Sequence, residues 1–226
     1  MSTLAVIPAR AGSKGIVRKN LRDFGGRPLV WHAVTCALAC PGIDRVIVST
    51  DDPAIADVAR DAGAEVPFLR PAELALDETP GVAPILHALE TLGPVKEVVV
   101  LQPTSPLRTA ADVTGTMALR RQQGAPAAIS VCDAPCHPAW MYSRDANGRL
   151  VPFLDGPHTV RRQDLSPVVV PNGAVYVADA AWLMRTGSFV SSETVGFVMP
   201  AERSVDLDDE YDWLFAELLL SKQIAS

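Results

Sequence analysis

The sequence has 226 residues, of which 48% are hydrophobic and 20% are charged, a composition that supports one sizeable buried core. Its formal net charge of -6 argues against a nucleic-acid or anionic-membrane partner, because such surfaces are bound largely through lysine and arginine. The first ten residues are too short for a signal-peptide core, and no run approaches the roughly 18 apolar residues of a membrane span. We therefore expect a cytoplasmic protein.

Apolar, β-rich runs alternate with helical patterns from the first residues onward. The predicted strands cover 4–8, 45–49, 66–68, 97–102 and 127–132, and the predicted helices between them cover 27–39, 53–63, 83–92 and 111–123. Strands rich in valine, isoleucine and leucine, each followed by a helix, predict an α/β fold with a mostly parallel sheet covered on both faces. Ligands bind at the carboxyl ends of such strands, which here are the loops after Ile7, Val48, Val100 and Val131.

The alternation breaks at 133–171, a stretch rich in Pro, Arg, His and Gly with a hairpin turn predicted at Asn147 and Gly148. It is too long for an ordinary connection. We interpret it as an excursion that covers the site or reaches a second subunit. Strands are then predicted at 172–178, 193–200 and 203–207, and helices at 179–185 and 209–221. We read 1–226 as one domain that carries this excursion.

The loop after the first strand concentrates positive charge in an acidic protein. Its cations are Arg10, Lys14, Arg18, Lys19 and Arg22. Gly12 and Gly15 let the backbone approach a ligand, Ser13 can donate a hydrogen bond, and the cations can neutralise a polyphosphate. Neither a Walker A loop nor G-x-G-x-x-G is present, which argues against kinase-like ATPases and nicotinamide enzymes. A solvated basic turn is the plainer alternative.

Near the other end, Asp206 and Asp208 stand two residues apart in a strand-like stretch, so both carboxylates leave the same face. Such a pair suits Mg²⁺, which takes one or two carboxylates and fills its other positions with water and substrate phosphate. Asp209 and Glu210 are predicted to stabilise the start of the last helix, and helix capping is also an alternative role for Asp208. A basic glycine loop with a carboxylate pair indicates phosphoryl chemistry by positioning and charge neutralisation.

Eight segments of the chain carry a family resemblance. They read IPARAGSKGIVRKNL, IVSTDD, VPFLRPAELA, LHALE, LQPTSPLRT, RRQDL, PNGAVYV and SVDLDDE. In order and spacing they resemble the acylneuraminate cytidylyltransferases, also called CMP-sialic acid synthetases, over almost the whole chain. The resemblance implies a Rossmann-like sheet with a small dimerisation excursion. It also implies a homodimer that uses Mg²⁺ and transfers CMP from CTP to the anomeric hydroxyl of a nonulosonic acid, releasing pyrophosphate.

The resemblance also implies roles for particular residues. Those expected to bind CTP are Arg10, Gly12, Ser13, Lys14, Asn20, Arg70, Thr79 and Gly81, and Lys19 is expected to act on the phosphates in the transition state. Those expected to bind the sugar are Gln102, Trp140, Arg162 and Val170, with Arg162 also a candidate contact to a partner subunit. Asp206 and Asp208 are the expected metal ligands and act in catalysis.

Two departures from the family pattern bear on the substrates. Residues 76–81 read LDETPG where the family usually has S-D-T-A-S-S, which shapes the cytosine pocket. Trp140 and Val170 stand where sialate-using members carry basic residues. These apolar side chains predict a legionaminic-like or otherwise modified sugar at least as strongly as N-acetylneuraminic acid.

Four other functions fit some of the same residues. Kdo cytidylyltransferases share the fold but open with a different loop that lacks SKG. A sugar-phosphate nucleotidyltransferase, or a glycosyltransferase with a D-x-D metal pair, would also use the carboxylates. A non-enzymatic nucleotide-binding module would keep the basic loop but does not need both Asp206 and Asp208.

Overall fold

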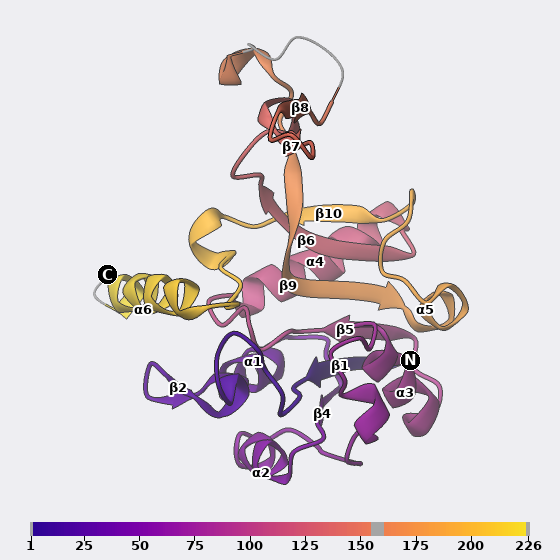
Figure 1. The fold of residues 1–226 in the computed structure, drawn as a ribbon. Coiled ribbons are helices and arrows are strands. Elements are labelled where there is room, and N and C mark those ends of the chain that lie inside the picture. The colour runs from indigo at the N-terminus through magenta and orange to yellow at the C-terminus, as the bar shows by residue number, and fades with distance from the viewer. Residues whose placement is uncertain (1, 155–160, 225–226) are drawn as a thin grey trace.

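A computed structural model of the chain describes residues 2–154 and 161–224. Its central sheet has the strand order β10-β6-β9-β5-β1-β4 (Figure 1). These strands are β1 (Thr3–Pro8), β4 (Arg45–Ser49), β5 (Glu97–Val100), β6 (Ala127–Asp133), β9 (Val169–Asp179) and β10 (Val195–Val198). All pairings are parallel except those of β9, which runs antiparallel to β5 and β6. The mostly parallel, Rossmann-like sheet predicted from the sequence is thereby confirmed.

Helices cover both faces of this sheet, and the alternation of side chains along β1 shows why. Ala5 and Ile7 pack with α1 (Leu29–Leu38), α2 (Pro53–Asp61) and α4 (Ala110–Gln123). Leu4 and Val6 point the other way and pack with α3 (Ala83–Leu92) and α5 (Ala180–Thr186). Because both faces are buried, residues 4–8 of the strand are all apolar, as the sequence pattern predicted.

Several helices begin at residues whose side chains cap them. Asp52 accepts a hydrogen bond from the amide of Ala54 and α2 starts at the following proline, while Asp179 caps α5 in the same way. Thr109 and Asp112 form a reciprocal capping box for α4. These caps satisfy amide groups that the first helical turn leaves unpaired.

Two predicted strands are not formed. At 66–68 only isolated bridges flank the segment, from Glu65 to Ile47 and from Leu69 to Thr50, because Pro67 has no amide hydrogen to give to a ladder. At 203–207 the chain follows η5 (Ala201–Arg203) and then runs without regular structure. The amide of Leu207 donates to the carbonyl of Thr104 in the loop after β5. Because this stretch forms no ladder with the sheet, Asp206 and Asp208 do not lie on a strand.

A third apolar cluster lies under the last helix, α6 (Glu210–Ile224). It joins Ile16 of the glycine loop to Leu207 and to Trp213 of α6, all essentially buried. The cluster therefore holds the N-terminal loop and the C-terminal carboxylate segment against each other. The short hairpin of β2 (Asp23–Phe24) and β3 (Arg27–Pro28) packs beside it through Phe24.

The excursion projects from the sheet between β6 and β9 (Figure 1). It contains the hairpin β7 (Tyr142–Arg144) and β8 (Leu150–Pro152), with Gly148 in the turn at φ 82°, as predicted. The remaining short helices are η1 (Lys19–Leu21), η2 (Ala72–Leu74), η3 (Pro138–Trp140) and η4 (Arg162–Asp164). Within the described residues, the helices are all too short or too polar to cross a membrane.

Candidate active site

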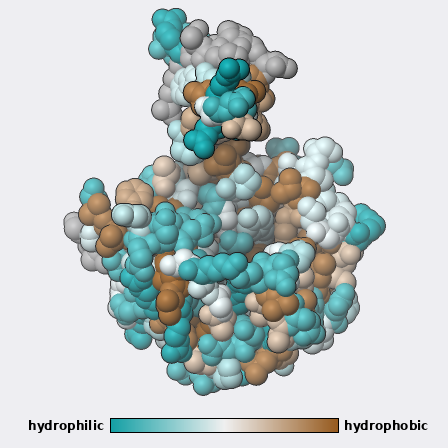
Figure 2. All heavy atoms as spheres, viewed as in Figure 1, coloured by the Kyte–Doolittle hydropathy of each residue, from teal (hydrophilic) through white to brown (hydrophobic). Residues whose placement is uncertain are grey.

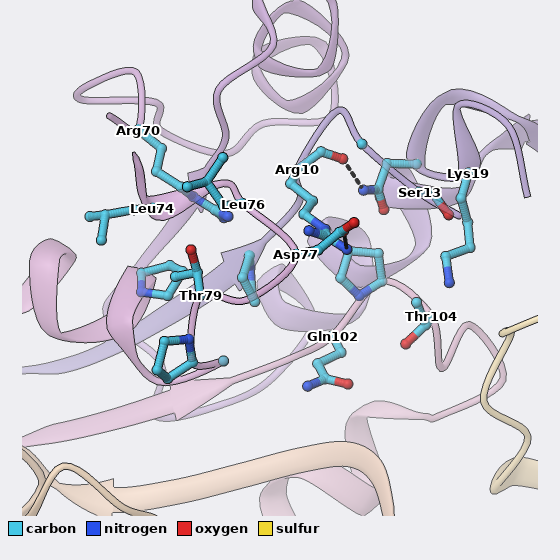
Figure 3. Close-up of a pocket in the computed structure, with 17 residues that line it drawn as sticks. Arg10, Ser13, Lys19, Arg70, Leu74, Leu76, Asp77, Thr79, Gln102 and Thr104 are labelled. Carbon is cyan, nitrogen blue, oxygen red and sulfur yellow. Dashed lines mark hydrogen bonds and ion pairs between the residues drawn. The ribbon is translucent and has the colours of Figure 1, made fainter. Parts of the chain in front are cut away.

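The candidate site lies at the carboxyl ends of β1, β4 and β5, where the sequence predicted it. One cavity of about 300 Å³ opens there. It is lined by Pro8, Arg10, Gly12, Ser13, Lys19, Asn20, Arg70, Leu74, Leu76, Asp77, Thr79, Pro80, Gly81, Pro84, Gln102, Pro103 and Thr104. Figure 3 shows Arg70, Leu74, Leu76 and Thr79 on one side, Ser13 and Lys19 on the other, and Arg10 with Asp77 between them.

Side chains from within and beside the glycine loop hold its backbone in place. The amide of Asn20 donates to the carbonyl of Arg10 at 2.8 Å, which ties the two ends of the loop together. The amide of Ala11 donates to Asp51 Oδ1 at 2.9 Å, so the loop is also tied to the end of β4. Asn20 is buried, and its Oδ1 has no hydrogen-bond partner.

The two loop glycines serve different purposes. A Cβ atom placed on Gly12 meets nothing within 4 Å, so this backbone is open to a ligand. A Cβ placed on Gly15 would overlap the carbonyl oxygen of Asp208. Gly15 is therefore required by the contact between the loop and the carboxylate segment. We expected Gly15 to lie close to a ligand, but it lies close to the backbone of Asp208.

Arg70 lines the cavity and is 5% exposed. Its guanidinium donates to the carbonyl of Ser49 and, through Nε at 3.1 Å, to the Ser49 hydroxyl. Burial lowers the pKa of Arg70 to about 10, so the side chain stays charged at neutral pH. A buried positive charge at the end of β4 favours an anionic or strongly polar ligand in this cavity.

Gln102 and Asp206 meet around a bulge in β9. Opposite Ser130, the register between β6 and β9 shifts, and Ser130 Oγ accepts from the Val175 amide at 2.8 Å. The bulge carries Gly173 at φ 75°, a conformation that favours glycine. A Cβ there would stand 3.2 Å from both Asp206 Oδ2 and Gln102 Oε1. The bulge thus brings these two side chains to the same place.

Lys19 joins the glycine loop to the carboxylate segment. Its ammonium donates to the carbonyl of Leu207 at 2.6 Å and lies 3.8 Å from Asp208 Oδ1. The Lys19 side chain is 13% exposed, whereas the Asp208 side chain is 81% exposed. Asp209, and not Asp208, caps α6 by accepting from the amides of Tyr211 and Asp212. The capping alternative for Asp208 is therefore wrong.

The carboxylate pair fits a divalent cation. Asp206 Oδ1 is buried and has no hydrogen-bond partner. Burial, and then the nearby charge of Asp208, raise the pKa of Asp206 above its ordinary value. A bound cation would offset both the cost of burying the Asp206 charge and its repulsion by Asp208. Among the described residues no cluster of three or more His, Cys, Asp or Glu could hold a metal, so the remaining ligands would come from substrate phosphate and water.

Other predicted residues lie outside this cavity. Lys14 is exposed and reaches the cavity wall through an ion pair with Asp77 at 2.8 Å. Trp140 lines a second cavity of about 240 Å³ at the base of the excursion. Val170 lies at the start of β9, opposite Cys132. The side chain of Arg162 lies outside what the structure describes. Within one chain, the structure does not bring the tryptophan and the valine to Gln102.

Sequence reasoning missed three residues that shape the site. Arg108 is 4% exposed and donates to the carbonyls of Gln102 at 2.6 Å and Ala174 at 3.0 Å, which fixes β5 and β9 together. Asn172 donates to the Ser204 hydroxyl at 2.9 Å and so positions the approach to Asp206. Asp77 contacts two loop cations. The available sequence signals were the family-like segments LQPTSPLRT, which contains Arg108, and PNGAVYV, which contains Asn172.

The chain is similar in sequence to known proteins. A family model described as Cytidylyltransferase matches residues 4–114. The CMP-N,N'-diacetyllegionaminic acid synthase of Legionella pneumophila is 34% identical over 226 residues, covering 97% of each chain. The N-acylneuraminate cytidylyltransferase of Streptococcus agalactiae is 29% identical over 216 residues, covering 95% of this chain and 52% of that one.

The fold has a solved counterpart as well. A CMP:2-keto-3-deoxy-manno-octonic acid synthetase complexed with CTP superposes with a TM-score of 0.75 at 18% identity, covering 99% of this chain and 100% of that chain. That likeness shows the fold. The identity to the Legionella protein extends over nearly the whole chain. The chain therefore belongs to the cytidylyltransferase family, in the group of acylneuraminate cytidylyltransferases or CMP-sialic acid synthetases.

Proposed function

We propose that the protein transfers CMP from CTP to the anomeric hydroxyl of a nonulosonic acid and releases pyrophosphate. The observation that carries this proposal is a single cavity that is lined by the cations Arg10 and Lys19, by Ser13 and by Gln102. The carboxylate segment is tied to that cavity by the bond from Lys19 to Leu207. Family membership and the Legionella relative, named for CMP transfer to a nonulosonic acid, support the same reaction.

The reaction needs positioning and charge neutralisation more than a nucleophilic side chain. The anomeric oxygen forms a bond to the α-phosphorus as the bond from that phosphorus to the bridging oxygen of the β-phosphate breaks. The electron pair leaves with pyrophosphate, and the hydroxyl proton passes to solvent. Arg10, Lys14 and Lys19 would neutralise the oxygens on which negative charge grows. Ser13 and the open backbone at Gly12 would donate hydrogen bonds to the phosphates.

Asp206 and Asp208 would hold a divalent cation, which we take to be Mg²⁺. When bound, the cation would neutralise phosphate charge next to the sugar hydroxyl. The unpaired, buried oxygen of Asp206 supports this assignment from within the chain. Lys19 would hold the segment that contains Asp208 against the glycine loop. The cation site would then keep a fixed position relative to the phosphates.

The nucleoside would occupy the side of the cavity formed by Arg70, Leu74, Leu76, Thr79 and Gly81 (Figure 3). The hydroxyl of Thr79 donates to the carbonyl of Glu73 at 3.0 Å. The side chain of Thr79 therefore supports its own loop, and so does its amide, which donates to the carbonyl of Leu76 at 3.3 Å. Contacts to the base would then come from backbone carbonyls of this segment. Backbone contacts of this kind tolerate the sequence departure at 76–81.

For the sugar we propose an acylated, deoxygenated nonulosonic acid of the legionaminic type, with Gln102 hydrogen-bonded to its amide. The relative at 34% identity is named for N,N'-diacetyllegionaminic acid, which supports this choice. Trp140 and Val170 would reach a sugar only from a neighbouring subunit, and we propose a homodimer in which they do so. Apolar walls favour acyl and deoxy positions, because an unpaired buried hydroxyl costs about 1 to 3 kcal/mol.

The test is to supply CTP, Mg²⁺ and single nonulosonic acids and to measure pyrophosphate release. We expect turnover with a 7-acylamido, 9-deoxy sugar at a kcat/KM equal to or above that for N-acetylneuraminic acid. A matched pair of variants separates the roles: Gln102→Leu should lower kcat/KM for the sugar, whereas Gln123→Leu, at the end of α4, should not. A preference of more than tenfold for N-acetylneuraminic acid would contradict the sugar assignment, and no pyrophosphate from any sugar would contradict the reaction.

A further inference from the structure

One carboxylate of the protein occupies the cation cluster of the cavity. Asp77 Oδ1 lies 2.7 Å from Arg10 Nη2, and Asp77 Oδ2 lies 2.8 Å from Lys14 Nζ. Each oxygen therefore contacts a different cation of the glycine loop. Figure 3 shows this carboxylate beside Arg10, between the nucleoside side of the cavity and Lys19. An oxyanion that bridges two cations in this way occupies the place that two phosphate oxygens would take.

The contact is maintained by charge and not by packing. The side chain of Asp77 is 41% exposed and that of Lys14 is 79% exposed. Arg10 also donates to the carbonyl of Ala75 at 3.3 Å, so it binds the same short segment twice. Leu76, next to Asp77, is half exposed and outside the three apolar cores. The Lys14 ammonium first, and Arg10 after it, lower the pKa of Asp77 below its ordinary value, so it is an anion at neutral pH.

We propose that Asp77 is an internal counter-anion that holds the triphosphate position when no nucleotide is bound and is displaced when CTP binds. The segment 75–78 would then leave Arg10 and Lys14 with each CTP bound and return to them as pyrophosphate departs. This inference rests on the proposed function, because it requires the cavity to bind a triphosphate. It adds a competition between the protein's own carboxylate and the substrate.

The ion pairs of Asp77 are weak enough for a triphosphate to replace them. Exposed ion pairs contribute little and are screened by salt, so the segment is released easily. A triphosphate carries several charges and would otherwise meet the Asp77 carboxylate at close range, which repels it. Displacement removes that repulsion but costs the two ion pairs, so Asp77 should weaken CTP affinity on the order of 3- to 10-fold. The same competition should speed the release of pyrophosphate.

The experiment compares Asp77→Asn with Glu78→Gln by calorimetry, using CTP, inorganic pyrophosphate and cytidine as ligands, with EDTA present. Glu78 is the adjacent exposed carboxylate and does not line the cavity, so its variant removes the same charge from the same segment. We expect Asp77→Asn to bind CTP and pyrophosphate 3- to 10-fold more tightly, with the gain shrinking at high salt. Cytidine affinity should not change, and Glu78→Gln should match the wild type throughout.

The possible failures are distinguishable. Weaker binding of cytidine by Asp77→Asn would make Asp77 a nucleoside contact and overturn the inference. An equal gain in Glu78→Gln would reduce the effect to net charge and overturn it as well. If the wild-type protein binds CTP as tightly as Asp77→Asn or more tightly, this inference is wrong and the proposed function is unaffected. Wild-type protein that binds neither CTP nor pyrophosphate would overturn the proposed function and the inference with it.

Discussion

Burying the carboxylate of Asp206 costs free energy of folding that contacts within the chain do not offset. One of its oxygens is buried without a partner, and burial raises its pKa. Buried charges are normally paired or bound to a metal, because desolvating an isolated carboxylate is expensive. A residue that is unfavourable for folding and placed beside a substrate cavity is best explained by a role in binding a cation.

Replacing Asp206 with Asn should have opposite effects on stability and on activity. Asp206→Asn keeps the size and removes the charge, so we expect pyrophosphate release to fall on the order of 10²-fold or more while Tm stays equal or rises. Asp208→Asn should lose activity similarly. Glu202→Gln, an exposed carboxylate in η5 of the same segment, is the control and should retain both activity and Tm. Near-normal turnover by Asp206→Asn at saturating Mg²⁺ would exclude the metal-ligand role.

Lys19 lines the cavity in which we propose that the phosphates bind, and it also contacts the carboxylate segment. Because it is tied to Leu207 and mostly buried, it is poorly placed to steer CTP from solution. We expect Lys19→Ala to lower kcat at saturating CTP, since an interaction made mainly in the transition state is lost there. Steady-state kinetics with CTP varied will measure it. A change in the KM for CTP alone would make Lys19 a binding residue only.

At the scale of the elements, the glycine loop and the carboxylate segment form one unit although they are far apart in sequence. Ile16, Leu207 and Trp213 bury them together, and Arg22 adds an ion pair to Glu210 at 2.5 Å. Arg22 also lies 4.2 Å over the ring of Trp213. One of the five loop cations therefore fastens α6 to the loop and is not directed at a ligand.

Gly15 is the tightest point of this unit, and a methyl group there should separate its halves. Gly15→Ala would place Cβ on the Asp208 carbonyl, which is backbone and cannot move cheaply. We expect Tm to fall by several degrees, as for other overpacking substitutions that cost about 1 to 3 kcal/mol. Gly12→Ala, whose Cβ meets only open space, should leave Tm unchanged and serves as the control. Equal Tm values for both variants would contradict the contact.

At the scale of the whole molecule, the excursion has a surface that a monomer does not need. Its described residues expose large apolar side chains, among them Leu150 at 67% and Phe153 at 65%, and Figure 2 shows brown surface on this projection. Apolar groups gathered on a projecting hairpin are typical of a protein interface. This supports the proposed homodimer.

The homodimer can be tested by placing a charge on that surface. Leu150→Asp should shift the protein from dimer to monomer in sedimentation velocity and lower pyrophosphate release, because the neighbouring excursion no longer completes the sugar site. Leu38→Asp, which changes a half-exposed leucine on α1 of the main body, should stay dimeric and active. A wild-type protein that is monomeric and fully active at assay dilution would refute the arrangement.

The sequence by itself determined what depends on neighbours along the chain. The period of apolar residues predicted the strands and helices of the sheet. The helices predicted to start at 53 and 179 begin at 53 and 180, where Asp52 and Asp179 cap them through local hydrogen bonds. Eight motifs in order predicted the family. The clustering of cations after β1 predicted where an anion would bind, because carboxyl ends of parallel strands meet at one edge.

Only the tertiary structure decided which distant groups meet. It placed β9 antiparallel between β5 and β6, made Gly15 a contact for Asp208, and left 204–208 without a strand. It also set Asp77 between Arg10 and Lys14, and Trp140 away from the cavity. These outcomes depend on packing and charge between segments far apart in the chain, and no local pattern encodes such contacts.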